Sequence, residues 1–382
     1  MSVDINNLYN EVLNIRRELH QIPELGYEEY ETSAYIKEKL KEYGYKYETI
    51  LNTGVLVHIK GRTSKKAIAF RADIDGLMIE EKNDISFKSK HKNKMHACGH
   101  DGHMAILLGF ARFLSTKKSI DRDIVLIFQP AEEGPGGAKR IVEEGILNKY
   151  NVENIFGLHI FPEINEGKIG VCKGPMMAQT GEIDISIKAK SGHGAIPHKA
   201  IDGVYIASQL INSYQSIVSR NVDPLDSSVI TIGKIKGGEA RNIIAEDIYM
   251  EGIIRTFNNE VYQLIKDRIK SINAGLEEMY NVKIDVEIRD MYPAVNNDEE
   301  LFDYIINIFD KEDVIKLKPM MIAEDFAFYQ QQIKGFFFML GSRNEDEKFV
   351  NSLHSSKFNF DEKILINGIE IYKNICNKYE VF

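Results

Sequence analysis

AIAFRADIDG, residues 67–76, is an apolar run that ends in two aspartates. Its first five residues have the length and composition of a strand that is buried on both faces. Two later runs share this character, IVLIF at 124–128 and NIFGL at 154–158. Continuous apolar strands are typical of a parallel sheet covered by helices on both sides. This stretch therefore predicts an α/β fold.

Helical patterns stand before and between these strands. Residues 31–43 place apolar side chains at roughly helical spacing, and Gly44 follows as a natural helix stop. A second helix is expected from about 103 to 114, with Asp101 as its N-cap. The alternation of strand and helix supports the parallel arrangement.

The pattern changes after residue 180. EIDISIKAK at 182–190 alternates apolar and polar residues, as a strand with one exposed face does. The segment that it begins predicts β-α-β-β-α-β, the order of a ferredoxin-like split βαβ unit. Its further elements are expected at 204–219 (helix), 228–235 and 247–257 (strands), 261–280 (helix) and 282–292 (strand).

The helix–strand alternation resumes after residue 292, with a strongly apolar strand at 335–340 and a final helix. The predicted fold class is therefore α/β with a mostly parallel sheet, interrupted by a compact α+β insertion. We expect the α/β domain to comprise 1–179 and 293–382, and the insertion to comprise 180–292.

Composition narrows the class of protein. Of the 382 residues, 43% are hydrophobic and 27% charged, as in globular proteins. Lys and Arg number 48 and Asp and Glu 57, so the formal charge of −9 argues against nucleic-acid binding. The chain shows no apolar run of roughly 20 residues, no secretory signal and too few cysteines for a disulfide framework. We expect a soluble cytoplasmic protein.

Potential metal ligands gather in MHACGHDGH, residues 95–103. The Cys98 thiolate and the His100 imidazole, two residues apart, can close on one metal ion. A polar loop with one buried cysteine explains this segment alone equally well. A Cys98 nucleophile with His100 as its base is a further alternative.

Acidic and imidazole groups follow each buried strand. Asp73 follows the first run, Glu132 and Glu133 the second, and His159 the third. Ligands of open α/β sheets bind at this carboxyl edge. One of two adjacent carboxylates can bind a metal while its neighbour takes a proton from water. A thiol nucleophile would leave both glutamates without a role, so the residues favour a metal site.

Eight segments, in order along nearly the whole chain, resemble the two-metal aminoacylase and carboxypeptidase superfamily. Within it they are similar to the amidohydrolase branch of hippurate hydrolase, indole-acetyl-amino-acid hydrolase and N-acetyldiaminopimelate deacetylase. The segments are RRELHQIPELGYEE (16–29), RADIDG (71–76), MHACGHD (95–101), FQPAEEGPGGA (128–138), GLHIFPE (157–163), SGHGAIPH (191–198), AEDFAFY (323–329) and LHSSKF (353–358).

The resemblance implies two divalent ions per chain (zinc, manganese, cobalt or nickel) and an inserted lid that dimerises. The implied metal ligands are Cys98, His100, Glu133, His159 and His354. The other implied site residues are Glu132 as general base, Asp73 as a carboxylate that orients a ligand, His193 as an oxyanion donor from the partner subunit, and Asn242 and Arg255 for the substrate carboxylate. Arg71 stands where other branches carry a histidine ligand.

The implied activity is metal-dependent hydrolysis of the amide bond of N-acyl-L-amino acids. Residues 128–138 and 216–233 look especially similar to N-acetyldiaminopimelate deacetylase, which implies release of acetate from N-acetyl-L,L-diaminopimelate during lysine biosynthesis. A broad hippurate-type hydrolase and a dipeptidase or carboxypeptidase are the alternatives within enzymes. The alternative outside enzymes is a non-catalytic protein that binds an amino-acid derivative. The expected partners are a small-molecule substrate and a second copy of the chain, without nucleic acid or membrane.

Overall fold

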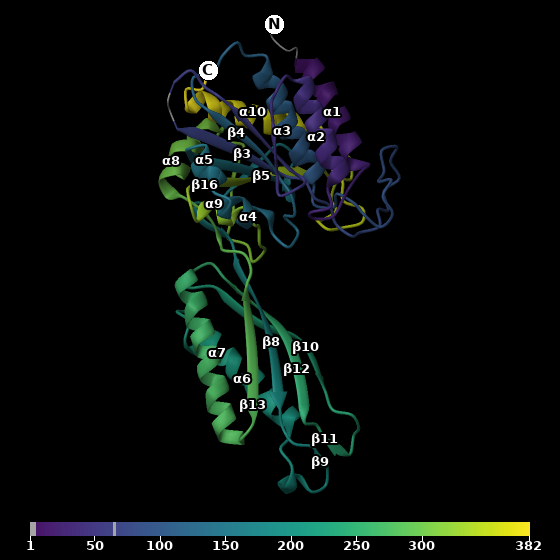
Figure 1. The fold of residues 1–382 in the computed structure, drawn as a ribbon, viewed down its shortest axis with the longest axis vertical. Coiled ribbons are helices and arrows are strands. Elements are labelled where there is room, and N and C mark those ends of the chain that lie inside the picture. The colour runs from purple at the N-terminus through teal and green to yellow at the C-terminus, as the bar shows by residue number, and fades with distance from the viewer. Residues whose placement is uncertain (1–4, 64–65) are drawn as a thin grey trace. The chain divides into compact units, whose positions relative to one another are not determined.

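The computed structural model describes residues 5–63 and 66–382. These residues divide into two compact units (Figure 1). Unit 1 contains the described residues up to Gly174 together with Asn296–Lys318 and Asp325–Phe382, and unit 2 contains Pro175–Val295 and Pro319–Glu324. The boundaries thus lie within a few residues of 179/180 and 292/293, and the short segment Pro319–Glu324 groups with the insertion.

Unit 1 is built on an eight-stranded sheet in the order β1-β2-β4-β3-β5-β16-β6-β15. The neighbours β4, β3, β5 and β16 are parallel to one another, and β15 is parallel to β6. The mostly parallel sheet predicted from the sequence is confirmed. The strands are β1 (Glu48–Ile50), β2 (Gly54–Ile59), β3 (Ala67–Asp73), β4 (Ile124–Gln129), β5 (Val152–Asn165), β6 (Ile169–Val171), β15 (Val314–Lys316) and β16 (Lys334–Arg343).

The core of unit 1 lies between this sheet and the helix α3 (His100–Ser115). Every residue of β3 and β4 is buried, as the apolar runs predict. Helix α3 packs on β3, β4 and β5 and also contacts α1 (Ile5–His20) and α10 (Ile364–Lys378). The remaining helices are α2 (Tyr30–Glu42), α4 (Gly137–Glu143), α5 (Ile146–Lys149), α8 (Glu299–Ile305), α9 (Ala327–Gln330) and a 3₁₀ turn at Ile306–Ile308.

Two local predictions in unit 1 are wrong. Helix α3 begins three residues earlier than expected, and its N-cap is Gly99, with φ of +88°, rather than Asp101. Asp101 lies in the first turn, where its carboxylate binds the side chains of Arg16 and His20. His159 does not follow the third strand but lies inside β5, because β16 continues to pair with β5 beyond the point where β3 ends.

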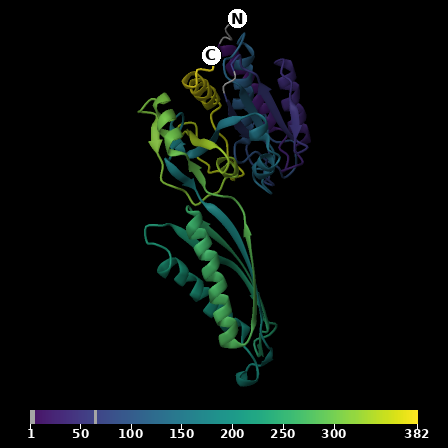
Figure 2. The ribbon, with the colours of Figure 1, turned by 60° about the vertical axis from the view of Figure 1, so that its left-hand side comes forward.

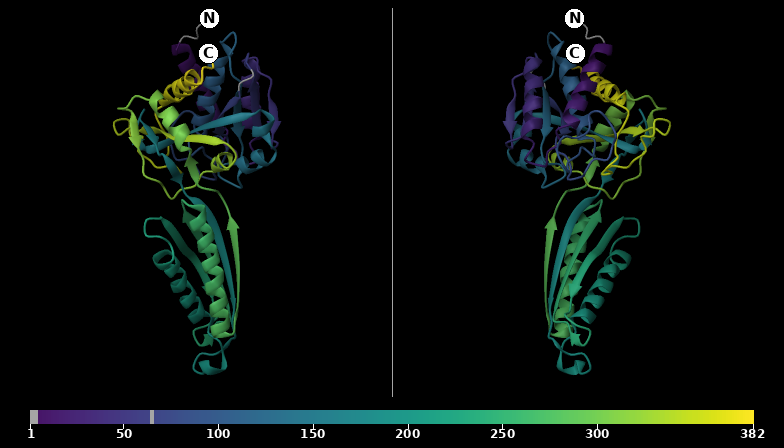
Figure 3. Two further views of the ribbon diagram at one scale, coloured as in Figure 1. Left: turned by 90° about the vertical axis from the view of Figure 1, so that its left-hand side faces the viewer. Right: turned by 90° about the vertical axis from the view of Figure 1, so that its right-hand side faces the viewer.

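Unit 2 contains a four-stranded sheet in the order β10-β12-β8-β13, with every neighbouring pair antiparallel. This is the strand order of a split βαβ unit. Helices α6 and α7 lie on one side of the sheet, and α7 runs along its length (Figures 2 and 3). The elements are β8 (Gln179–Lys188), α6 (Gly203–Arg220), β10 (Ser228–Gly237), β12 (Asp247–Thr256), α7 (Asn259–Tyr280) and β13 (Lys283–Asp290).

The period-two pattern of β8 explains which of its faces is buried. Ile183, Ile185 and Ile187 of β8 are buried, whereas the residues between them are half-buried. The apolar side chains belong to the core that α6 and α7 close. Short elements complete the described chain: β7 (Gly174–Met177), β9 (Gly192–His193), a 3₁₀ turn at Pro197–Lys199, β11 (Ile243–Ile244) and β14 (Val295–Asn297). No helix among the described residues is long and apolar enough to cross a membrane.

Candidate metal centre

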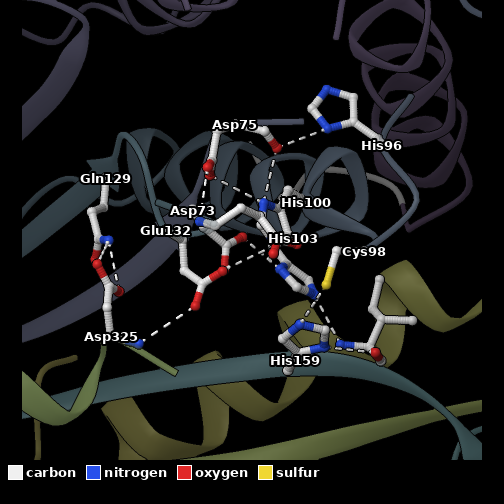
Figure 4. Close-up of polar contacts among 12 residues, drawn as sticks. Asp73, Asp75, His96, Cys98, His100, His103, Gln129, Glu132, His159 and Asp325 are labelled. Atoms are coloured by element: carbon white, nitrogen blue, oxygen red, sulfur yellow. Dashed lines mark hydrogen bonds and ion pairs between the residues drawn. The ribbon is translucent and has the colours of Figure 1, made fainter. Parts of the chain in front are cut away.

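The carboxyl edge of the unit 1 sheet gathers the side chains that the sequence predicts there (Figure 4). Asp73 is the last residue of β3, and Glu132 and Glu133 lie on the loop that follows β4. Cys98 precedes α3, whose first residue is His100, and His159 lies on β5. Because the strands end at one edge, residues distant in sequence become neighbours.

Two groups of potential metal ligands share Cys98. The first contains Cys98, His100 and His159, and the second contains Cys98, Glu133 and His354. Within each group the candidate ligand atoms lie within 4.8 Å of one another. Cys98 Sγ is 3.3 Å from His159 Nε2, and His354 Nε2 is 3.1 Å from Glu133 Oε1. The five residues predicted as ligands are therefore adjacent in space, with the thiol in the middle.

The hydrogen bonds of the two buried imidazoles fix which nitrogen faces the centre. His100 Nδ1 donates to the carbonyl oxygen of Asp75 at 2.9 Å. His159 Nδ1 donates to the carbonyl oxygen of Ile160 at 2.7 Å. In both rings Nε2 is the nitrogen that faces the centre, and His100 Nε2 has no hydrogen-bond partner among the described residues. Metal-binding histidines are commonly oriented in this way.

His103 is close to the centre but has no nitrogen left for a metal. Its Nε2 accepts a hydrogen bond from the backbone N–H of Ile160 at 2.9 Å. Its Nδ1 must then carry the proton, which it donates to Asp73 Oδ1 at 2.6 Å. Asp73 Oδ2 accepts from Arg71 Nη1 at 2.6 Å. The carboxylate of Asp73 therefore binds His103 directly, and its Oδ2 also lies 3.7 Å from Nε2 of the candidate ligand His100.

The half-exposed His354 is held near Cys98 by its backbone. Its N–H donates to the carbonyl oxygen of Ala97 at 2.9 Å, and its φ is +62°. The side chain of His354 is 52% exposed to solvent, whereas that of Glu133 is 17% exposed. Glu133 is held in turn by its N–H, which donates to Asp75 Oδ2 at 2.9 Å. The second group of ligands therefore forms the open side of the centre.

The electrostatics of the centre favour bound cations. Burial raises the pKa of the Cys98 thiol well above its usual value, and Glu133 and Glu132 raise it further. Burial lowers the pKa of His159 to about 3. Burial also disfavours the charged form of His100, but Asp73 and Asp75 outweigh it and raise its pKa to about 10. Buried carboxylates therefore surround the thiol and the imidazoles, and their negative charge favours bound cations. A metal ion would keep the thiol and the imidazole nitrogens deprotonated.

The donor set matches transition metals rather than magnesium or calcium. A thiolate with imidazole nitrogens and a carboxylate suits zinc and its first-row neighbours, whereas magnesium and calcium prefer oxygen ligands alone. The unpartnered His100 Nε2 and the shared Cys98 both fit such ions.

Glu132 lies beside the five predicted ligands, and its carboxylate is itself close enough to His100 and Glu133 to be a candidate ligand. It is 6% exposed, and its Oε1 accepts the backbone N–H of Asp325 at 3.4 Å. His100, Glu132 and Glu133 also form a compact group of acidic and imidazole atoms. A buried carboxylate at this place can exchange a proton with a molecule bound at the centre.

The other predicted site residues belong to unit 2. His193 of β9 pairs with Ile243 of β11, and the carbonyl of Asn242 accepts the N–H of Gly194 at 2.8 Å. Unit 2 thus brings His193 and Asn242 to one pair of loops. Arg255 lies near the far end of β12, and its Nη1 donates to the carbonyl of Ile254 at 2.9 Å.

Three residues that hold the predicted site residues in position were not themselves predicted. Asp75 orients His100 and Glu133, His103 binds Asp73, and Asp325 contacts Glu132. All three stand in or beside the quoted motifs RADIDG, MHACGHD and AEDFAFY, so the motifs mark the right segments. Their hydrogen-bond partners follow only from the packed structure.

Comparison with known proteins assigns the chain to a family. Residues 69–378 match the model of peptidase family M20/M25/M40. The chain belongs to this family. The resemblance inferred from the eight sequence segments is thereby confirmed.

Relatives of the M20 family cover almost the whole chain. N-acetyldiaminopimelate deacetylase of Listeria monocytogenes is 41% identical over 369 residues, which are 95% of this chain and 98% of the relative. The N-acetyldiaminopimelate deacetylase of Bacillus subtilis strain 168 is 39% identical over 97% of this chain and 98% of its own length.

Solved structures show the same M20 fold. The YxeP protein of Bacillus subtilis, a dinuclear metal-binding peptidase of the M20 family, has a TM-score of 0.86 and 31% identity, covering 98% of this chain and 99% of that one. A putative aminohydrolase from methicillin-resistant Staphylococcus aureus has a TM-score of 0.92 and 34% identity, covering 98% of this chain and 97% of that one.

Proposed function

We propose that this chain is a dinuclear metal-dependent amidohydrolase that removes the acetyl group from N-acetyl-L,L-diaminopimelate. The observation that carries the proposal is the pair of ligand groups that share Cys98, with Glu132 beside them. The deacetylases that are about 40% identical over nearly the whole chain support the choice of substrate. We place the reaction in the cytoplasm, in lysine biosynthesis.

Cys98, His100, Glu133, His159 and His354 would hold the two ions, and Cys98 belongs to both groups of candidate ligands. When bound, two divalent ions would make water more acidic and polarise the amide carbonyl. The backbone carbonyls of Asp75 and Ile160 keep His100 and His159 in the tautomer that binds metal. Asp73 supports the ligands through its hydrogen bond to His103 and through its negative charge beside His100.

Glu132 moves the protons in this proposal. Its carboxylate takes a proton from water as the water oxygen bonds to the acyl carbon. The same carboxyl group then gives the proton to the amide nitrogen as the C–N bond breaks, which releases acetate and the free amine. Burial keeps competing water away from this carboxylate, and the N–H of Asp325 orients it.

The unit 2 residues complete the proposed site. Arg255 would hold the substrate carboxylate through its planar fork of donors, together with Asn242 of the partner subunit. His193 would donate to the oxyanion from the partner subunit of a homodimer. Unit 2 also carries exposed apolar side chains, of the kind that contacts between proteins commonly bury. They include Ile196, Val204, Tyr205 and Ile243.

The substrate is tested by comparing kcat/KM for N-acetyl-L,L-diaminopimelate, hippurate and N-acetyl-methionine. We expect the first to be preferred by about tenfold or more, which corresponds to about 1.4 kcal/mol of transition-state binding. A preference of that size for hippurate would replace the biosynthetic substrate with a hippurate-type one. The absence of any hydrolysis in the metal-loaded protein would contradict the enzyme itself.

The action of His193 across a dimer is tested by mixing inactive subunits. A Glu132→Gln subunit retains His193, and a His193→Ala subunit retains Glu132. If His193 acts in trans, each mixed dimer has one intact site, so random equal mixing should restore about a quarter of wild-type activity. Differently tagged subunits that copurify serve as the control for exchange. Proven exchange without recovered activity would show that His193 does not act across the interface.

A further inference from the structure

Arg71 is a buried cation at the centre that cannot bind a metal. It is 1% exposed, and its guanidinium donates in three directions. Nε binds Gln129 Oε1 at 2.8 Å, Nη1 binds Asp73 Oδ2 at 2.6 Å and Nη2 binds Asp325 Oδ1 at 2.9 Å. Burying a charge this deeply costs free energy unless the charge is paired. The carboxylates of Asp73 and Asp325 provide that pairing for Arg71.

The first arm of this arrangement leads from Arg71 to Glu132. Besides Arg71, the Asp325 carboxylate accepts hydrogen bonds from Gln129 Nε2, at 2.8 and 2.7 Å, and from the backbone N–H of Ala138 at 2.9 Å. The backbone N–H of the same Asp325 donates to Glu132 Oε1 (Figure 4). The Asp325 carboxylate thus takes part in four hydrogen bonds, one from Arg71, two from Gln129 and one from Ala138. Because they immobilise the side chain, they also fix the backbone N–H that binds Glu132.

The second arm leads from Arg71 to His159. Asp73 accepts from Arg71 on one oxygen and from His103 Nδ1 on the other. His103 Nε2 then accepts the N–H of Ile160, the residue that follows His159 on β5. The His103 and His159 rings also meet edge to face, with centroids 4.6 Å apart.

We propose that Arg71 is a positioning residue that fixes Glu132 through Asp325 and His159 through Asp73 and His103. The inference rests on the proposed function, in which Glu132 is the general base. A planar guanidinium can bind Gln129, Asp73 and Asp325 at once, whereas the ammonium of lysine, a compact point charge, cannot reproduce this fork. Arg71 acts through these residues and is not itself catalytic.

The Glu132 arm is tested by a double-mutant cycle between Asp325→Asn and Glu132→Gln. Asparagine keeps the shape and the backbone N–H of Asp325 but brings an amide group toward the donors of Gln129 and Ala138. We expect Asp325→Asn alone to lower kcat by about tenfold or more, with KM changed by less than about threefold and metal content unchanged. In the Glu132→Gln background the same change should alter the residual rate by less than about twofold.

The double-mutant cycle distinguishes failure of the positioning inference from failure of the proposed function. If Asp325→Asn lowers the rate by the same factor in both backgrounds, Asp325 does not act through Glu132 and the inference is wrong, while the proposed function stands. If Glu132→Gln alone leaves the rate within about threefold of wild type, the general base lies elsewhere and both fail.

The His159 arm is tested by Arg71→Lys in protein reconstituted with cobalt. The visible spectrum of cobalt reports the geometry of its thiolate and imidazole ligands, independently of turnover. We expect this spectrum to change in Arg71→Lys and to remain that of wild type in Asp325→Asn. Arg122→Lys is the matched control, because Arg122 pairs with Glu153 at the opposite edge of the same sheet. It should leave both the spectrum and kcat unchanged.

An unchanged cobalt spectrum in folded Arg71→Lys would overturn the second arm of the proposal. A spectrum that changes equally in Arg122→Lys would do the same, since the effect would then be a general one of losing an arginine. Thermal unfolding of each variant shows whether it is folded. Asp325→Asn leaves Arg71 in place, so the first arm can be judged even if Arg71→Lys does not fold.

Discussion

Glu132→Gln is expected to lower kcat by about 10²–10⁴-fold while two metal equivalents remain bound. Glutamine has nearly the same shape as glutamate, and its carbonyl oxygen can still accept the N–H of Asp325. What is lost is the ability to take a proton from water and to deliver it to the leaving amine. Steady-state kinetics with N-acetyl-L,L-diaminopimelate, together with elemental analysis of the same preparation, measure both quantities.

Glu143→Gln is the control for this prediction. Glu143 lies on α4, shortly after the same loop, but its side chain is exposed and pairs only loosely with Lys139, at 3.9 Å. This variant should have wild-type kcat and metal content. A Glu132→Gln enzyme that loses its metals would instead show that Glu132 is a ligand, and one with near-wild-type kcat would exclude it as the base.

Cys98→Ser is expected to lower the metal content from two equivalents to less than about one per chain, with loss of activity. Cys98 belongs to both ligand groups, so its replacement should weaken the binding of both ions. A serine hydroxyl stays protonated at neutral pH and is a far poorer ligand than a thiolate. Elemental analysis after dialysis against metal-free buffer measures the loss.

Cys172→Ser is the matched control, because Cys172 is similarly buried in unit 1 and belongs to neither ligand group. Its metal content should equal that of wild type. If Cys98→Ser keeps two equivalents, Cys98 is not a ligand and the assignment of the shared position fails.

Much of the fold could be predicted because burial leaves a periodic trace in sequence. The runs that became β3 and β4 are mostly apolar, since both faces of each strand are covered. The strand β8 alternates, because helices cover only one of its faces. Turn and end positions were less certain, as Asp101 shows. An aspartate in a first helical turn serves as a cap or as an ion-pair partner, and the docking of α1 decides between them.

The gathering of the candidate ligands at one place could be predicted from the sequence, but the residues that hold them in position could not. Cys98, His100 and Glu133 are chemically distinctive, and they stand at strand ends and helix starts that the sequence marks. The contact between Arg71 and Asp325 joins residues 254 positions apart, so no local pattern indicates it. The tautomer of His103 depends likewise on the N–H of Ile160, which only the folded sheet brings near.

The order in which the segments of this chain are synthesised affects how the sheet of unit 1 can form. β16 lies between β5 and β6 in the sheet but is synthesised after all of unit 2's main segment. Until β16 emerges, the long apolar strand β5 keeps an open edge, which invites wrong pairing with other chains. His354 and Asp325 are also synthesised late, so a chain that lacks them has neither the full set of candidate ligands nor the N–H that binds Glu132. We therefore expect the full set of candidate ligands to assemble only after β16 and the segment that carries His354 have been synthesised.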